Sequence, residues 1–155
     1  MTLKDCQLKL QKQLDLSLDW ATDNGIFFDM EKTELIYFHN KRKFEEFPLQ
    51  AKDFLVKPKE IIRWLGIYFD RKLSFKEHVR LACQRSRIIT DHVRRLCNTN
   101  RGTSPSLLRQ AIQGCAFVSL FYGAETWYGP QTSKCGLNQV QIALNRAARA
   151  VLPVY

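Results

Sequence analysis

The chain has 155 residues, of which 45% are hydrophobic and 25% are charged. This length fits one ordinary domain or two small subdomains with a buried core, and only seven Gly and five Pro, with no low-complexity block, exclude a fibrous or disordered protein. The 24 Lys and Arg residues outnumber the 15 Asp and Glu residues and give a net charge of +9, which favours an anionic partner.

The first residues mix both charges, with Lys4, Asp5 and Lys9 close together, so they lack the uninterrupted apolar stretch of a signal peptide. The longest apolar stretch, 111–127, contains Gln113 and is shorter than the roughly 20 residues of a spanning helix. We therefore expect an intracellular protein, in the nucleus or the cytoplasm, without a membrane partner.

The five cysteines are odd in number and include no CxxC pair, a pattern that fits reduced thiols. Cys83 and Cys97 could be combined with His78 and His92 into a metal site. Their spacings match no zinc pattern, so we predict no metal site.

The leucines of segment 3–23 recur at helical spacing between polar residues, which predicts an amphipathic helix. Asn24 and Gly25 should end it, because both tolerate the left-handed conformation that closes many helices. Two short apolar runs follow, 26–28 and 35–38, separated by polar residues. They predict two strands buried largely on both faces.

Segment 47–56 alternates weakly and predicts one or two strands that end near Pro58, where the missing amide donor would interrupt a ladder. Segment 61–69 is the strongest strand prediction in the chain. Gly66 lies inside it, and a glycine in a strand usually marks a bulge or a close approach of another backbone.

A long helix is predicted after Ser74, which resembles an N-cap because Glu77 follows three residues later. Its apolar positions step by four and three, and Arg80, Arg87 and Arg94 are seven apart, so these arginines form a basic ridge beside the apolar stripe. The apolar positions are Phe75, Val79, Ala82, Ser86, Ile89, Val93 and Leu96.

The positive charge is concentrated in and around this helix. Between Arg71 and Arg101 there are nine basic and two acidic residues, and 9 − 2 = +7 is most of the net charge. Such a field attracts a polyanion, most commonly a phosphate backbone. A solvated helix face is the alternative.

Two more helices are predicted. Pro105 suits the first turn of one, and the other covers 137–151, with Arg146 and Arg149 outside its apolar stripe and Pro153 ending it. The inner face of the first should consist of Leu108, Ala111, Ile112, Cys115, Val118, Ser119 and Tyr122.

The predicted fold class is α+β. A helix and a small, mostly antiparallel sheet occupy residues 1–72, and a bundle of three helices occupies residues 73–155.

Four segments stand in a particular order and together cover nearly the whole chain. They are 20–28 followed by Lys32-Thr33-Glu34, then 64–70 (Trp-Leu-Gly-Ile-Tyr-Phe-Asp), 73–78 (Leu-Ser-Phe-Lys-Glu-His) and 122–127 (Tyr-Gly-Ala-Glu-Thr-Trp). In this order the chain resembles the reverse transcriptases of non-LTR (LINE-type) retrotransposons. The resemblance implies that residues 1–72 are the C-terminal part of the palm and residues 73–155 the thumb.

The resemblance also implies roles for single residues. Lys32 would lie near the incoming nucleotide, where an ammonium can neutralise the leaving pyrophosphate. Trp64, Leu65 and Gly66 would form the primer grip. A lysine in a polar turn and a core aromatic at Trp64 are the alternatives. The thumb residues that would follow a nucleic-acid backbone are Lys76, Arg80, Arg87, Arg94 and Arg95.

Polymerisation in this family needs Mg²⁺ held by an Ala-Asp-Asp type loop before the first helix seen here, and no Asp-Asp pair occurs in the chain. We therefore expect a fragment that has no catalytic residues or cofactor, is inactive alone, and grips RNA, DNA or their hybrid, with the missing palm and fingers as partners in trans. The alternatives are a stand-alone basic module that binds nucleic acid without catalysis and a helical protein-interaction surface.

Overall fold

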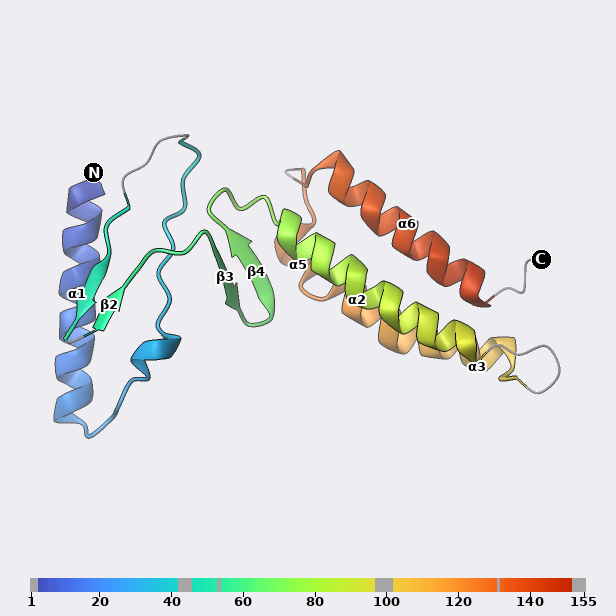
Figure 1. Ribbon diagram of the computed structural model, residues 1–155, viewed down its shortest axis with the longest axis horizontal. Coiled ribbons are helices and arrows are strands. Elements are labelled where there is room, and N and C mark those ends of the chain that lie inside the picture. Colours follow the sequence, from blue (N-terminus) through green and yellow to red (C-terminus); the bar gives the residue numbers. More distant parts are fainter. Residues whose placement is uncertain (1–2, 42–45, 53, 97–101, 131, 152–155) are drawn as a thin grey trace. The chain divides into compact units, whose positions relative to one another are not determined.

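The computed structural model describes residues 3–41, 46–52, 54–96, 102–130 and 132–151. Over these residues the chain has the predicted α+β class, with several helices and two small two-stranded sheets (Figure 1). It divides into two compact units, Met1–Ile62 and Arg63–Tyr155, whereas the sequence placed a boundary at residue 72. Each unit has a hydrophobic core of its own.

The first unit begins with helix α1 (Leu3–Asp23), as the spacing of its leucines predicted. Leu18 and Ala21 are buried. The helix ends where expected, because Gly25 has a left-handed φ of 66° and its amide donates to the Thr22 carbonyl at 3.2 Å.

A short hairpin packs on this helix. Strands β1 (Leu49–Ala51) and β2 (Phe54–Val56) pair antiparallel, so segment 47–56 holds two strands, within the prediction. Gln11 of α1 holds β1: its side-chain amide donates to the Gln50 carbonyl at 2.7 Å and its oxygen accepts from the Gln50 amide at 2.9 Å. The core of the unit consists of Leu18, Leu35, Tyr37, Leu49, Ala51 and Val56.

Neither of the two apolar runs predicted as strands is one. Residues 26–28 are irregular, and Phe27 is 96% exposed. Within 35–38, the described pairing is a single bridge between Leu35 and Pro58, which proline cannot extend because it has no amide hydrogen. Both predictions were wrong because a short apolar run becomes a strand only beside a partner, which its own pattern does not reveal.

The predicted strand 61–69 is a hairpin. Strands β3 (Ile61–Trp64) and β4 (Ile67–Asp70) form a two-stranded sheet. Leu65 and Gly66, which connect them, have φ values of 47° and 84°, the positive values of a type I′ turn. The prediction of a single strand was wrong because this turn has leucine at the position where asparagine or aspartate usually indicates a hairpin.

Tyr122 holds this turn in place. Its hydroxyl donates to the Leu65 carbonyl at 2.9 Å, which helps to offset the cost of a left-handed leucine. Its ring lies against Gly66, where an added Cβ would come within 2.9 Å of the ring carbon Cε1. Gly66 therefore marks a close approach, as its place in the sequence suggested, but by a side chain and not by a backbone.

Asp70 organises the loop that leads into helix α2 (Lys76–Arg95). Its carboxylate accepts from the backbone amides of Lys72, Ser74 and Phe75 at 3.0, 3.1 and 2.7 Å. It also accepts from the Ser74 hydroxyl at 3.1 Å. Ser74 does not cap the helix as predicted, because its hydroxyl donates to Asp70. The N-cap position is instead taken by Phe75, which has a φ of 53°.

The rest of the second unit is helical (Figure 1). The predicted three helices correspond to α2, a continuous middle segment made of α3, η2 and α4, and α6, whereas the short α5 was not predicted. Helix α2 contacts both the middle segment and α6. The elements after α2 are α3 (Pro105–Ala111), the π-helical η2 (Ile112–Phe117), α4 (Val118–Phe121), α5 (Ala124–Trp127) and α6 (Lys134–Val151).

The predicted stripe of α2 is largely confirmed, although its last position, Leu96, lies just after the helix and is exposed. The stripe of the middle segment is not, because Cys115 and Val118 are exposed. The π-helical turn is wider than an α-helical one, so positions four apart stay on one face. The buried positions are Leu108, Ile112, Ala116 and Leu120.

A buried histidine joins the β3–β4 hairpin to the corner before α5. The Tyr68 amide lies 3.4 Å from His78 Nδ1, and His78 Nε2 lies 3.3 Å from the Tyr122 carbonyl. Because an amide can only donate and a carbonyl can only accept, the ring is neutral with its proton on Nε2. Burial lowers the His78 pKa, the hydrogen bond with the Tyr122 carbonyl partly opposes this, and the nearby Arg85 charge lowers the pKa further.

We expect the second unit to lose stability as the pH falls below the ordinary histidine pKa of 6.5. A lowered folded-state pKa means that the unfolded chain takes up the proton first, so the contribution is complete above this pH and declines below it. Amide hydrogen exchange in α2, measured from pH 7.5 down to pH 5, should show the slope. His78→Gln should flatten it, and an unchanged slope in that variant would contradict the assignment.

Candidate nucleic-acid interface

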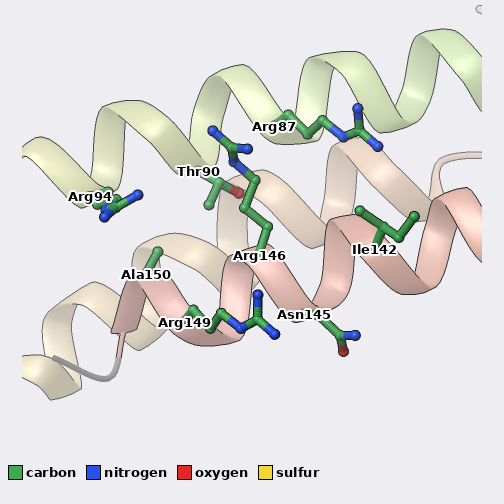
Figure 2. Close-up of a pocket in the computed structure, with 8 residues that line it drawn as sticks. All are labelled: Arg87, Thr90, Arg94, Ile142, Asn145, Arg146, Arg149 and Ala150. Carbon is green, nitrogen blue, oxygen red and sulfur yellow. The ribbon is translucent and has the colours of Figure 1, made fainter. Parts of the chain in front are cut away.

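A groove lined by four arginines lies between α2 and α6. The apolar stripes of these helices face the core, and the arginines stand beside those stripes, so the two helices bring their basic edges together (Figure 2). The groove has a volume of about 670 Å³. Its lining residues are Arg87, Thr90, Arg94, Ile142, Asn145, Arg146, Arg149 and Ala150.

Arg87 is the most enclosed of the four arginines. Its Nε atom is buried and has no hydrogen-bond partner among the residues that the structure describes. Arg94 and Arg149 are exposed on opposite helices. An anion in the groove could accept hydrogen bonds from these guanidinium groups, which match phosphate oxygens in geometry and in charge.

Arg146 reaches across the groove to α2 (Figure 2). Its Nη2 lies 2.7 and 2.9 Å from the two carboxylate oxygens of Asp91, and its Nε lies 3.0 Å from Oδ1. This forked pair links α6 to α2 and places one acid within the row of arginines.

The other predicted backbone-binding residues occupy different settings. Arg80 is held by Glu77 through bonds of 2.8 and 2.6 Å, an interaction that raises the Arg80 pKa and lowers the Glu77 pKa. Arg80 and Arg87 line a second hollow that continues along α2. Lys76 and Arg95 are exposed at the two ends of the helix. The three arginines of the predicted ridge therefore lie on one helix, but one of them, Arg80, already has a carboxylate partner.

Lys32 belongs to the first unit and lies at the end of the short 3₁₀ helix η1 (Met30–Lys32). Its side chain is 84% exposed, and its Nζ lies 2.6 Å from Asp29 Oδ2. The hydrogen bond with Asp29 raises the Lys32 pKa, so the ammonium form is favoured.

The three predicted primer-grip residues form the tip of the β3–β4 hairpin. Trp64 is 63% exposed and contacts Phe69 at a ring-centroid distance of 6.1 Å, so it does not belong to the core. Leu65 is also exposed, and Gly66 lies against Tyr122. The tip thus presents apolar surface to solvent, held in shape by the tyrosine.

Arg146, Arg149 and Asp91 were not among the predicted site residues. One indication of a role for Arg146 and Arg149 was present in the sequence, because both lie outside the apolar stripe of α6. Their convergence with α2 could not be inferred from sequence, because it depends on which faces of two distant helices pack together. Tyr122 was predicted only as an inner-face residue of the middle helix and as part of a motif.

Within the described ranges there is no group of three or more His, Cys, Asp or Glu side chains that could hold a metal ion. Cys97, part of the disfavoured metal site, lies outside those ranges. No helix in the described part of the chain has the length and apolarity to cross a membrane. Comparisons of the chain with protein-family models, curated proteins and solved structures found no match.

Proposed function

We propose that the groove between α2 and α6 binds the phosphate backbone of RNA or DNA, and that the chain is the nucleic-acid-gripping part of a LINE-type reverse transcriptase. The observation that carries the proposal is the set of four arginines that line one groove from two helices. Three of them, Arg87, Arg94 and Arg149, have no carboxylate partner among the described ion pairs.

The lining also favours backbone contacts over base reading. It contains guanidinium groups, one hydroxyl and one amide, with no aromatic side chain on which a base could stack. Contacts of this kind neutralise phosphates and carry little sequence information. We therefore propose binding without sequence preference, as an enzyme that copies any template requires.

The family part of the proposal rests on the order of the four sequence segments. Within it, residues up to about 72 belong to the palm, Lys32 lies near the nucleotide, and Trp64, Leu65 and Gly66 support the primer. No Asp-Asp pair occurs in the sequence, so the proposal assigns no polymerisation step and no metal to this chain.

The salt dependence of duplex binding tests the groove. The variant Arg94→Gln with Arg149→Gln should bind a generic duplex more weakly, and its slope of log affinity against log salt should be shallower by about 1.8, since each lost phosphate contact removes about 0.9. Fluorescence anisotropy over a salt series measures both quantities. Duplexes of unrelated sequence should give equal affinities.

The matched control is Arg109→Gln with Lys134→Gln. Both residues are exposed in the same unit and neither lines the groove, while the loss of net charge is identical. The control should keep nearly the wild-type slope. An equal loss in both double variants would mean that net charge alone drives binding, and an unchanged slope in the groove variant would reject the groove as the binding site.

A further inference from the structure

Asp91 lies beside the arginine groove: it lines the second hollow along α2 and pairs with Arg146, which lines the groove. It lies four residues after Arg87 and three before Arg94, so the three side chains are neighbours on one face of α2. From that position it holds Arg146 of the opposite helix through three contacts of 2.7 to 3.0 Å. The side chains of Asp91 and Arg146 are 38% and 49% exposed, so a ligand can reach the pair.

A carboxylate paired with a guanidinium by two parallel hydrogen bonds has the same geometry as a phosphate in that place. Both sides of the Arg146 guanidinium fork are therefore occupied by Asp91 when no ligand is bound, whereas Arg94 and Arg149 have no carboxylate partner among the residues that the structure describes. The negative charge of Asp91 also opposes the entry of another anion between Arg87 and Arg94.

We propose that Asp91 is an internal competitor for the phosphate backbone, which occupies Arg146 in the free protein and lowers the affinity of the groove. This inference rests on the proposed function and adds its regulation. When a phosphate displaces the carboxylate, Arg146 changes partner, and Asp91 remains as a nearby negative charge that favours release. The groove then holds nucleic acid strongly enough to bind and weakly enough to let it move.

The variant Asp91→Asn tests the proposal. It keeps the size of the side chain but removes the charge, and we expect duplex affinity to rise about 3-fold to 10-fold at low salt, with a salt slope steeper by about 0.9, because one more arginine is free. The control is Glu125→Gln, an exposed acid of α5 outside the groove lining. It should change affinity much less.

A double-mutant cycle with Arg146→Gln separates competition from general charge effects. In the wild-type background Arg146→Gln should weaken binding less than Arg149→Gln, because Arg146 is already occupied. In the Asp91→Asn background, Arg146→Gln should abolish the increase in duplex affinity that Asp91→Asn produces. An Arg146→Gln loss as large as that of Arg149→Gln would overturn the proposal, and this comparison does not need the Asp91 variant to fold.

Inorganic tripolyphosphate as a second probe distinguishes the two proposals. If only this probe binds, and binds Asp91→Asn more tightly than wild type, then Asp91 competes with phosphate although the groove does not serve nucleic acid. A second outcome is that duplex binds with a salt slope that depends on the arginines, but Asp91→Asn binds duplex no more tightly than wild type although its amide hydrogen exchange in α2 is unchanged. The competitor role is then rejected, and the proposed function of the groove stands. If Asp91→Asn binds neither probe, the competitor role is overturned as well.

Discussion

Replacing Asp70 with alanine is expected to lower the free energy of unfolding of the second unit by about 2–4 kcal/mol, because it deletes a charged acceptor of several hydrogen bonds. Three backbone amides and one hydroxyl donate to this carboxylate. In its absence, the amide of Phe75 and its neighbours lose their partners in a partly buried loop. Leu73 and Phe75 would also have to keep left-handed φ values of 51° and 53° without that support.

Amide hydrogen exchange of the α2 backbone, compared with denaturant unfolding, measures this loss where it should occur. Asp70→Asn should lose less, because its remaining carbonyl oxygen can still accept from some of the same donors. Lys72→Ala serves as the control, since that exposed residue contributes only its backbone amide to the loop. A loss below about 0.5 kcal/mol in Asp70→Ala, the range of ordinary surface changes, would contradict the role given to the carboxylate.

Three of the sequence segments that carry the family resemblance meet in the second unit. Tyr122 of segment 122–127 bonds to Leu65 of segment 64–70, and His78 of segment 73–78 lies within hydrogen-bonding distance of both neighbouring segments. These motifs are therefore explained by mutual contacts that fix a hairpin against the start of a helix. A folding role accounts for them without requiring any of these side chains to touch a ligand.

Long periodic helices were the most predictable part of the fold. The spacing of apolar residues in α1, α2 and α6 extends over several turns, so local pattern and tertiary packing agree there. The short strands were not predictable in the same way, because pairing decides whether a short run becomes a strand. The turn at Leu65 also escaped, because its conformation depends on Tyr122, which lies far away in sequence.

The candidate site divides along the same line. Arg87 and Arg94 could be found because a seven-residue spacing places both on one face of a single helix. Arg149 and the competing Asp91 gain their meaning only from the packing of α2 against α6. The sequence could therefore indicate that a basic surface exists, but the groove, and the acid that pairs with one of its arginines, required the structure.

Trp127 gives the other large expected effect. It is 1% exposed and belongs to the core that Phe75, Val79 and Leu120 share, and its indole Nε1 donates to the Tyr122 carbonyl at 3.1 Å. Trp127→Ala should cost about 3–5 kcal/mol, the range for large aromatic residues deleted from cores.

Trp127→Phe separates packing from hydrogen bonding, since it keeps most of the aromatic volume but removes the Nε1 donor. His78 Nε2 also lies within reach of the Tyr122 carbonyl at 3.3 Å, so that oxygen keeps one partner and the phenylalanine variant should lose much less than the alanine variant. Tyr128→Ala, at the exposed neighbouring position, is the control for denaturant unfolding. Similar losses of unfolding free energy in Trp127→Ala and Tyr128→Ala would mean that Trp127 does not anchor the core. The position of Tyr122 over the Leu65 turn would then not be supported by Trp127.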